Sequence, residues 1–344
     1  MDLRFPAGLP GHPGCARVAR SGDFRPDTPP RMTAAASGTH TGEDRPSRRR
    51  PERPVRTPHE QTVLITGATN GLGRVLAELL AGTGRRVLLH GRDPVRVEQA
   101  RSEITDGTGN DRVEVLVADL AALHEVDRLA EDVRSRCPRL DALVNNAGIG
   151  TGGPDGARQV SRDGIELRFA VNYLAGYRLI TALEPLLLDS APARVLSIAS
   201  AGQRTIDFAD PLVESDYTGT RAYAQSKLAQ IMFTFDLAER WRGRGVEANA
   251  LHPATYMNTA MVREAGVTPV NTVRDGADAA LRLVTDPAFD GVTGRFFHGS
   301  RESRPLDQAF DPAARARLRE LSDELVAEAV GPGTVTTTVE GGSR

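Results

Sequence analysis

The chain has 344 residues, with 43 Lys and Arg against 45 Asp and Glu, and a formal net charge of −2. This balance gives no reason to predict a nucleic-acid or acidic-membrane partner. Two cysteines, Cys15 and Cys137, are too few for a disulfide framework, so we expect a reducing, cytoplasmic environment. The chain has no apolar run of about 18 residues, so no membrane span is predicted.

Lysine occurs only once, at Lys227, against 42 arginines. A bias in the base composition of the gene is the favoured interpretation of this imbalance, but it does not explain why one lysine is retained. Arginine can replace lysine on most solvated surfaces, but not where a compact ammonium with an adjustable pKa is needed. Lys227 is therefore a candidate functional residue, with retention by chance as the alternative.

The two ends of the chain differ in composition from the middle. Residues 1–60 hold 11 Arg, 7 acidic residues and 10 of the 22 prolines, without apolar periodicity, and we predict that they are disordered. A start codon assigned too far upstream, with Met32 inside this segment, and a basic recruiting arm are two further interpretations. Residues 331–344 are predicted to be a flexible tail. Residues 61–330 are expected to form one domain.

In that domain, short apolar runs alternate with helical patterns. Helices are predicted over Leu72–Leu80, Pro94–Ile104, Ala121–Arg136, Gly164–Leu188 and Tyr223–Arg242. Strands are predicted over Thr62–Thr66, Arg86–His90, Val113–Ala118, Asp141–Val144, Val195–Ala199, Val246–Leu251 and Gly294–His298. Fully apolar strands that alternate with helices predict an α/β fold, a Rossmann-type doubly wound parallel sheet of about seven strands with helices on both faces.

A glycine-rich turn follows the first predicted strand and opens the first helix. Its glycines permit a tight turn, and the helix N-terminus offers N–H groups and its positive dipole end to a pyrophosphate. A glycine turn without a ligand is the alternative. The residues predicted to contact a dinucleotide are Gly67, Thr69, Asn70, Gly71, Leu72 and Gly73.

The end of the second strand indicates which dinucleotide would bind. An acidic residue there would bind the ribose 2′-OH of NAD. This chain has Gly91 at that position, followed by Arg92, and a guanidinium suits a 2′-phosphate. We therefore predict that NADP(H) is favoured over NAD(H). Asp93 is expected to cap the next helix.

The next two strand ends add further candidate cofactor contacts. Asp119, which is followed by Leu120, could accept a hydrogen bond from the adenine amino group, although helix capping is a rival role. Asn145-Asn146-Ala147-Gly148 follows the fourth strand, where amide and small side chains suit the ligand crevice of an open sheet. A plain turn is the alternative. The predicted contacts from both segments are Asp119, Leu120, Asn145, Ala147 and Gly148.

The candidate chemical site centres on Lys227. Tyr223 precedes it by four residues at the predicted start of a helix, so both side chains share one helix face. A nearby ammonium would lower the pKa of the phenol, which suits a general acid/base acting on an alcohol or carbonyl. Ser200 ends the fifth predicted strand at the same sheet edge. Asn172 lies inside a predicted helix, where Asn is mildly unfavourable, and a solvated position is its alternative reading.

Together these motifs, in this order over about residues 61–300, resemble the short-chain dehydrogenase/reductase superfamily. The resemblance implies that Tyr223 is the general acid/base and that Lys227 lowers its pKa and binds the nicotinamide ribose. It also implies that Ser200 orients the substrate oxygen and that Asn172 anchors a water in a proton relay. Pro253, after the sixth strand, belongs to the same set of motifs.

Ser200 and Tyr223 are 23 positions apart, a longer spacing than is common in the superfamily. With the Tyr-Ala-Gln-Ser-Lys-Leu-Ala motif, this resembles retinol dehydrogenases, WW-domain-containing oxidoreductases and protochlorophyllide reductases, a subgroup that tends to use NADP(H). Ala254 stands where the superfamily usually has glycine and narrows the backbone freedom there, and the usual downstream threonine is displaced to Thr259, with Thr255 as another candidate. Nicotinamide contacts are expected from Pro253 and Thr255. Residues 255–272 are expected to form the substrate lid.

The predicted function is an NAD(P)(H)-dependent oxidoreductase that transfers a hydride between nicotinamide and the carbonyl or alcohol of an apolar small molecule. No metal site is predicted. A homodimer or homotetramer is expected by analogy, with the helix Tyr223–Trp241 as its interface. The alternative function is a catalytically silent dinucleotide-binding sensor or scaffold on the same fold. A sugar-nucleotide epimerase ranks lowest, because only about 90 residues follow the sixth strand.

Replacement of the single lysine by arginine tests the functional interpretation of Lys227. The variant Lys227→Arg keeps the charge but not the compact ammonium, so we expect loss of most of the oxidoreductase activity. Turnover of a panel of aldehydes, ketones and alcohols, followed by NADPH absorbance, measures the effect. A fully active arginine variant would mean that the lysine was retained by chance.

Overall fold

The computed structural model describes residues 56–152 and 156–331. The predicted tails therefore lie outside the described residues, except for their inner ends. At the N-terminal side, Pro58–Glu60 form one turn of 3-10 helix, closed by a capping box between Thr57 and Glu60. This turn lies slightly before the predicted domain start at residue 61. In the described ranges, no helix is long and apolar enough to cross a membrane.

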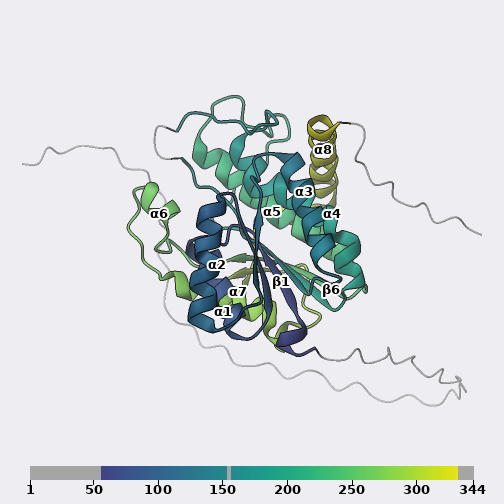
Figure 1. Ribbon diagram of the computed structural model, residues 1–344. Coiled ribbons are helices and arrows are strands. Elements are labelled where there is room, and N and C mark those ends of the chain that lie inside the picture. Colours follow the sequence, from purple (N-terminus) through teal and green to yellow (C-terminus); the bar gives the residue numbers. More distant parts are fainter. Residues whose placement is uncertain (1–55, 153–155, 332–344) are drawn as a thin grey trace, which may run out of the picture. The chain divides into compact units, whose positions relative to one another are not determined.

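The core element is an eight-stranded sheet in the order β3-β2-β1-β4-β5-β6-β7-β8, parallel except for the antiparallel pair β7–β8 (Figure 1). All seven predicted strands are present. The strand β8 is not predicted, because its three residues are partly or largely exposed and carry no apolar pattern. The strands are β1 (Thr62–Ile65), β2 (Arg86–Gly91), β3 (Val113–Val117), β4 (Ala142–Asn145), β5 (Ala193–Ile198), β6 (Val246–His252), β7 (Phe296–His298) and β8 (Arg301–Ser303).

Helices cover both faces of the sheet (Figure 1). One face carries α1 (Gly71–Gly82), α2 (Pro94–Thr108) and α7 (Val273–Thr285). The other carries α3 (Leu123–Arg136), α4 (Ala175–Asp189), α5 (Gly219–Arg240) and α8 (Pro312–Val330). Alternate residues of each strand belong to two separate cores. In β1, Val63 and Ile65 pack on the face that carries α1, and Leu64 packs on the face that carries α3. Burial on both faces explains why the strands are apolar throughout.

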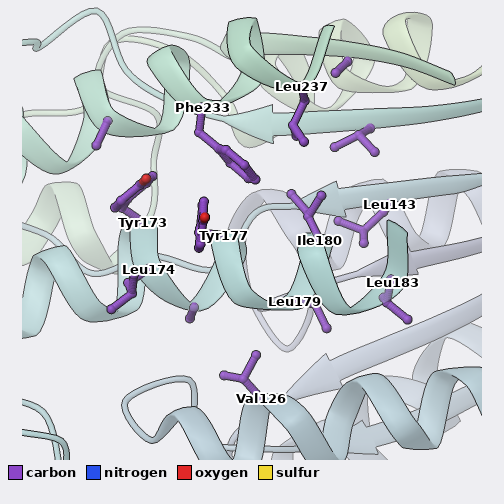
Figure 2. Packing of buried hydrophobic residues seen from close by; sticks show 14 of the residues in the cluster. Val126, Leu143, Tyr173, Leu174, Tyr177, Leu179, Ile180, Leu183, Phe233 and Leu237 are labelled. Atoms are coloured by element: carbon purple, nitrogen blue, oxygen red, sulfur yellow. The ribbon is translucent and has the colours of Figure 1, made fainter. Parts of the chain in front are cut away.

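The packing of α4 and α5 is built around aromatic rings. Figure 2 shows Tyr173 and Tyr177 facing Phe233 of α5, and the Tyr177 and Phe233 ring centroids are 4.8 Å apart. Both tyrosine hydroxyls reach α8: Tyr173 pairs with Ser322 at 2.7 Å, and Tyr177 donates to Asp323 at 2.5 Å. The C-terminal helix therefore satisfies the polar ends of the rings that hold α4 against α5.

Two helices differ from their predicted form. The helix α5 begins at Gly219, one turn before Tyr223, because the Thr218 side chain accepts a hydrogen bond from the Arg221 N–H at 3.1 Å and caps it there. The predicted helix Gly164–Leu188 contains a π-helical turn over Phe169–Leu174 that precedes α4. A π-helical turn leaves no local sequence pattern that would predict it, and such turns often occur at functional sites.

Helix α5 was expected to offer an interface to a second copy. In the structure nearly every residue from Ala224 to Ala238 is buried by the same chain. Helix α8 covers part of it, with Arg319 donating to Asp236 and Arg315 donating to Glu239, each at 2.7 Å. The apolar surface of α5 is therefore covered inside the chain, which leaves few of its residues for the expected contact with a second copy.

Candidate functional site

The glycine-rich turn lies between β1 and α1, at the carboxyl edge of the sheet. Gly67 and Gly71 have φ angles of 65° and 52°, a region that favours glycine. A Cβ atom at Gly67 would lie 2.8 Å from the Ala147 Cα, and one at Gly73 would lie 2.4 Å from the Gly67 carbonyl oxygen. Side chains are excluded at these positions because the turn, the helix and the end of β4 approach so closely.

The first turn of α1 suits an anionic ligand. Asn70 is the residue that precedes the helix, yet its side chain makes no capping hydrogen bond, and the first turn contains no acidic residue. The leading N–H groups of α1 therefore keep their hydrogen-bonding capacity and the positive end of the helix dipole. This is the arrangement that a pyrophosphate group requires, and the close approach of backbone at Gly67 and Gly73 fits it as well.

Two residues that the sequence interpretation did not select hold this turn. The His90 side chain accepts from the Gly67 N–H at 3.2 Å through Nδ1, and its Nε2 lies 3.0 Å from the Ala118 carbonyl oxygen. Burial lowers the pKa of His90 to about 4, so the ring is neutral and donates from Nε2. Asn146 donates from Nδ2 to the Gly67 carbonyl at 3.0 Å. A lone polar residue in an apolar strand was the available signal for His90.

The residues after β4 that were predicted to contact the cofactor lie in two different places. Asn145 is buried, and its Nδ2 atom lies 2.1 Å from where a Cβ of Gly176 in α4 would be, so this amide packs against the helix. Ala147 borders Gly67, and Gly148 lies beside Lys227. The latter two residues therefore line the crevice between the glycine turn and the chemical site.

The adenosine end of the predicted cofactor site is open. Arg92 is exposed, and no hydrogen bond or ion pair of its side chain is found among the described residues. A Cβ at Gly91 would lie 2.5 Å from the Thr69 Cγ2 atom, so a carboxylate could not stand at this position without displacing Thr69. Asp93 accepts from the backbone N–H groups of residues 95 and 96, which confirms its predicted capping role.

Asp119 has local partners. Its Oδ1 atom accepts from the Ala121 N–H at 3.0 Å, and its Oδ2 atom is 3.7 Å from the Arg162 guanidinium. The carboxylate thus organises the turn before α3 but does not cap that helix, whose N-cap residue is Ala122, and 29% of the Asp119 side chain remains exposed. Leu120 is buried in the core that contains α3 and α4.

Ser200 and Tyr223 meet at the carboxyl edge of the sheet. Ser200 lies two residues beyond the end of β5, and a hydrogen bond joins its side chain to that of Tyr223. Burial raises the pKa of the Tyr223 phenol, and the hydrogen bond from Ser200 only partly opposes this effect. The pKa therefore lies above its usual value, opposite to the direction expected from the neighbouring lysine.

Lys227 is buried, with 4% of its surface exposed, and its Nζ atom lies 5.7 Å from the centroid of the Tyr223 ring. The ammonium donates to the Ile198 carbonyl at 3.0 Å and to the Gln230 side-chain carbonyl at 2.8 Å. Both acceptors are neutral. Burial lowers the pKa of Lys227 to about 7, so its charge, and with it the field at Tyr223, changes near neutral pH.

Asn172 lies in the π-helical turn and is fully buried. Its Oδ1 atom accepts from the Ile149 N–H at 2.7 Å, and its Nδ2 atom donates to the Ile149 carbonyl at 3.2 Å and to the Ser226 hydroxyl at 3.0 Å. The side chain thus ties the segment after β4 to the helix between Tyr223 and Lys227. Its amide is used by protein partners in this arrangement.

A buried ion pair supports the same segment. Arg168 and Glu166 are 3% and 1% exposed, and Tyr217 hydrogen-bonds to both. Arg168 also donates to the carbonyls of Gly150 and Thr151 at 3.0 and 2.9 Å. Tyr217 belongs to the long insertion between Ser200 and Tyr223. One function of that insertion is therefore to hold the loop after β4, which the spacing alone did not reveal.

The expected lid lies across the crevice. It contains the short helix α6 (Ala260–Glu264), and Thr259 caps that helix. The Thr259 Cγ2 atom would lie 3.5 Å from a Cβ at Gly71, and Met261 Cγ would lie 2.8 Å from one at Gly150. The lid therefore reaches both the glycine turn and the loop after β4. Thr255 pairs with His252 at 3.2 Å.

Comparison with known proteins agrees with this architecture. The family described as short chain dehydrogenase matches residues 61–269. Retinol dehydrogenase 14 of Mus musculus is 33% identical over 294 residues, which cover 78% of this chain and 86% of that protein. WW domain-containing oxidoreductase of Danio rerio is 30% identical over 295 residues, covering 80% and 71%.

Two solved structures have similar folds. An uncharacterized protein from Mycobacterium paratuberculosis has a TM-score of 0.64 and 29% identity, covering 78% of this chain and 93% of that one. A short chain dehydrogenase from Escherichia coli CFT073, complexed with NADPH, has a TM-score of 0.59 and 28% identity, covering 70% and 97%.

The burial of Lys227 has a consequence for stability. When folding lowers the pKa of a cation, its charged form lowers the free energy of unfolding. This cost in stability is complete at pH values below the pKa of the folded state, and it disappears as the pH rises toward the pKa of the unfolded state. From the usual 10.5 to about 7, the cost is on the order of 5 kcal/mol below neutral pH. Lys227→Met should therefore gain stability relative to the wild type at pH 6, and the gain should shrink toward pH 10.

Thermal unfolding across this pH range measures the difference in melting temperature. The two carbonyls left without a donor reduce the gain in the variant, so the test is how the difference changes with pH rather than its size. A difference that stays constant from pH 6 to pH 10 would contradict a depressed lysine pKa.

Proposed function

Because the chain belongs to the short-chain dehydrogenase/reductase family, we propose that it reduces the carbonyl group of an apolar small molecule with NADPH, using Tyr223 as the general acid. The chain is an NAD(P)-dependent oxidoreductase that acts on CH–OH donors. The cofactor preference, the direction and the residue roles are the parts proposed here. The bound nicotinamide would supply the hydride.

The observation that carries this proposal is the meeting of Ser200, Tyr223 and Lys227 beside the uncapped N-terminus of α1. The Ser200 hydroxyl, already joined to Tyr223, is placed to hold a substrate oxygen next to the phenol. Tyr223 would then donate its proton to that oxygen as the carbonyl carbon is reduced. A Cβ at Gly148 would lie 3.5 Å from the Lys227 Nζ atom, so the glycine keeps a side chain away from the ammonium, which would bind the ribose hydroxyls.

The raised pKa of Tyr223 supports reduction at neutral pH. A phenol with a pKa above 10 is protonated there, and the protonated form is the one that donates to a carbonyl oxygen. Oxidation of an alcohol needs the phenolate instead. We therefore expect reduction to dominate near pH 7 and alcohol oxidation to gain as the pH rises.

The apolar character of the substrate is supported by the relatives and by the walls of the crevice. The curated relatives include proteins named retinol dehydrogenase, and retinol is an apolar alcohol. Ile149 and Met261 lie on the loop after β4 and on the lid that contacts it. Both side chains are apolar, which suits a substrate with little polar surface.

Substitution of the proposed general acid tests the mechanism. Tyr223→Phe should lower turnover of every active carbonyl substrate by about 100-fold or more, since general acid catalysis contributes at least that much. Tyr177→Phe, which removes a hydroxyl bonded to Asp323 of α8, is the control and should keep its activity. A Tyr223→Phe enzyme with wild-type turnover would favour a non-catalytic role for the site.

The role of Arg92 is tested by comparing the two cofactors. Arg92→Ala should weaken NADPH binding by about tenfold or more and leave NADH binding nearly unchanged, because it removes a charge-assisted contact to the 2′-phosphate. Fluorescence titration with each cofactor measures both constants. Arg242→Ala removes an exposed arginine beyond the C-terminal end of α5 and is the matched control. Tighter binding of NADH than NADPH by the wild type would refute the preference.

A further inference from the structure

The turn of α5 after Lys227 is apolar except for one residue. Leu228, Ala229, Ile231 and Met232 are completely buried, and Gln230 among them is 1% exposed. A leucine would fill such a position without any polar atom that needs a partner. A buried amide in this place therefore calls for a specific reason.

The two ends of the Gln230 amide are used differently. Its Oε1 atom accepts from the Lys227 ammonium at 2.8 Å. Its Nε2 atom has no hydrogen-bond partner in the part of the chain that the structure describes. A buried donor without an acceptor is unfavourable for stability. The unpaired Nε2 atom of Gln230 therefore lowers the stability of the fold, while its Oε1 atom contacts the lysine of the proposed site.

The surroundings of the ammonium make this contact important. The second hydrogen bond of the Lys227 ammonium goes to the backbone carbonyl of Ile198 on β5, at 3.0 Å. The titratable groups facing it are Tyr223 on α5 and His252 at the end of β6, which packs edge-on against His298. The pKa of His252 is lowered to about 4, so that ring is neutral. No carboxylate interacts with Lys227 among the described residues.

We propose that Gln230 is a positioning residue for this oxidoreductase: its side-chain carbonyl, together with the backbone carbonyl of Ile198, holds the Lys227 ammonium in place and favours its charged form. Two of the three N–H donors are then occupied, and one remains for a ribose hydroxyl. A neutral amide has an advantage over a carboxylate here, because it orients the ammonium without cancelling its field at Tyr223. The inference rests on the proposed function only for its effect on turnover.

The single lysine permits a direct test with the full chain. Labelling with lysine that carries ¹⁵N at Nζ yields one side-chain signal, whose titration reports the pKa of Lys227 alone. In Gln230→Leu the pKa should fall by at least about one pH unit, because a hydrogen bond to the charged form is lost. In Gln230→Glu it should rise above the wild-type value. A purely structural role would not move the pKa in opposite directions.

Thr234→Val is the matched control. Thr234 lies one turn further along α5. Its buried hydroxyl donates to the Gln230 backbone carbonyl and pairs with the Ser197 hydroxyl, without contacting Lys227. The pKa of Lys227 should be unchanged in this variant. Melting curves at pH 9, where the lysine is neutral in both proteins, should show Gln230→Leu to be no less stable than the wild type.

The kinetic counterpart is the pH profile of kcat for carbonyl reduction. Its inflection in Gln230→Leu should move to lower pH by the same amount as the lysine signal. An unchanged lysine pKa in both Gln230 variants would overturn the inference, as would a shifted pKa with an unmoved kinetic profile. If Tyr223→Phe remains active while the lysine signal still responds to Gln230, the proposed mechanism fails but the contact between the two residues stands.

Discussion

Burial of one ammonium at the carboxyl edge of the sheet is the constraint on which the site depends. Lys227 is held by two carbonyl groups and by no carboxylate in the described residues, so the protein accepts a charge that it only partly compensates. A buried charge of this kind lowers stability, and it is retained where its position and pKa have a use. Its acceptors come from β5 and α5, which fixes how these two elements must pack.

The cofactor side of the crevice depends on the absence of side chains. The sheet order changes direction between β1 and β4, and the glycine turn lies at this crossover, where open α/β sheets bind ligands. Gly67 and Gly73 let the glycine turn, α1 and the segment after β4 approach closely, while His90 and Asn146 hold the turn by hydrogen bonds. The two halves of the site meet at Gly148, next to the Lys227 ammonium.

How far the sequence predicts this arrangement depends on the kind of signal. Apolar runs predict strands well when both sheet faces are covered, so β1 to β7 are found within a few residues of their expected bounds. The strand β8 has no such signal, because it lies at the sheet edge. The start of α5 was missed by one turn, since Thr218 and Gly219 form a cap that only the local backbone reveals.

Packing between residues far apart in the sequence accounts for the other differences between the prediction and the structure. The pKa of Tyr223 depends on its burial, and the spacing to Lys227 predicts proximity but not desolvation. Gln230 was not selected because an amide three residues after a lysine is ordinary until its surroundings are known to be apolar. Helix α5 was expected to contact a second copy, but part of it is covered by α8, which follows much later in the sequence, at Pro312–Val330.

The most direct test of the account is the titration of the single ¹⁵N-labelled lysine in the wild-type protein, with and without NADP⁺. We predict a pKa of about 7 in the free protein and a distinct chemical shift and higher pKa when NADP⁺ is added, as a ribose hydroxyl takes the third N–H donor. An ordinary lysine pKa near 10.5, unaffected by NADP⁺, would contradict the central role given to Lys227.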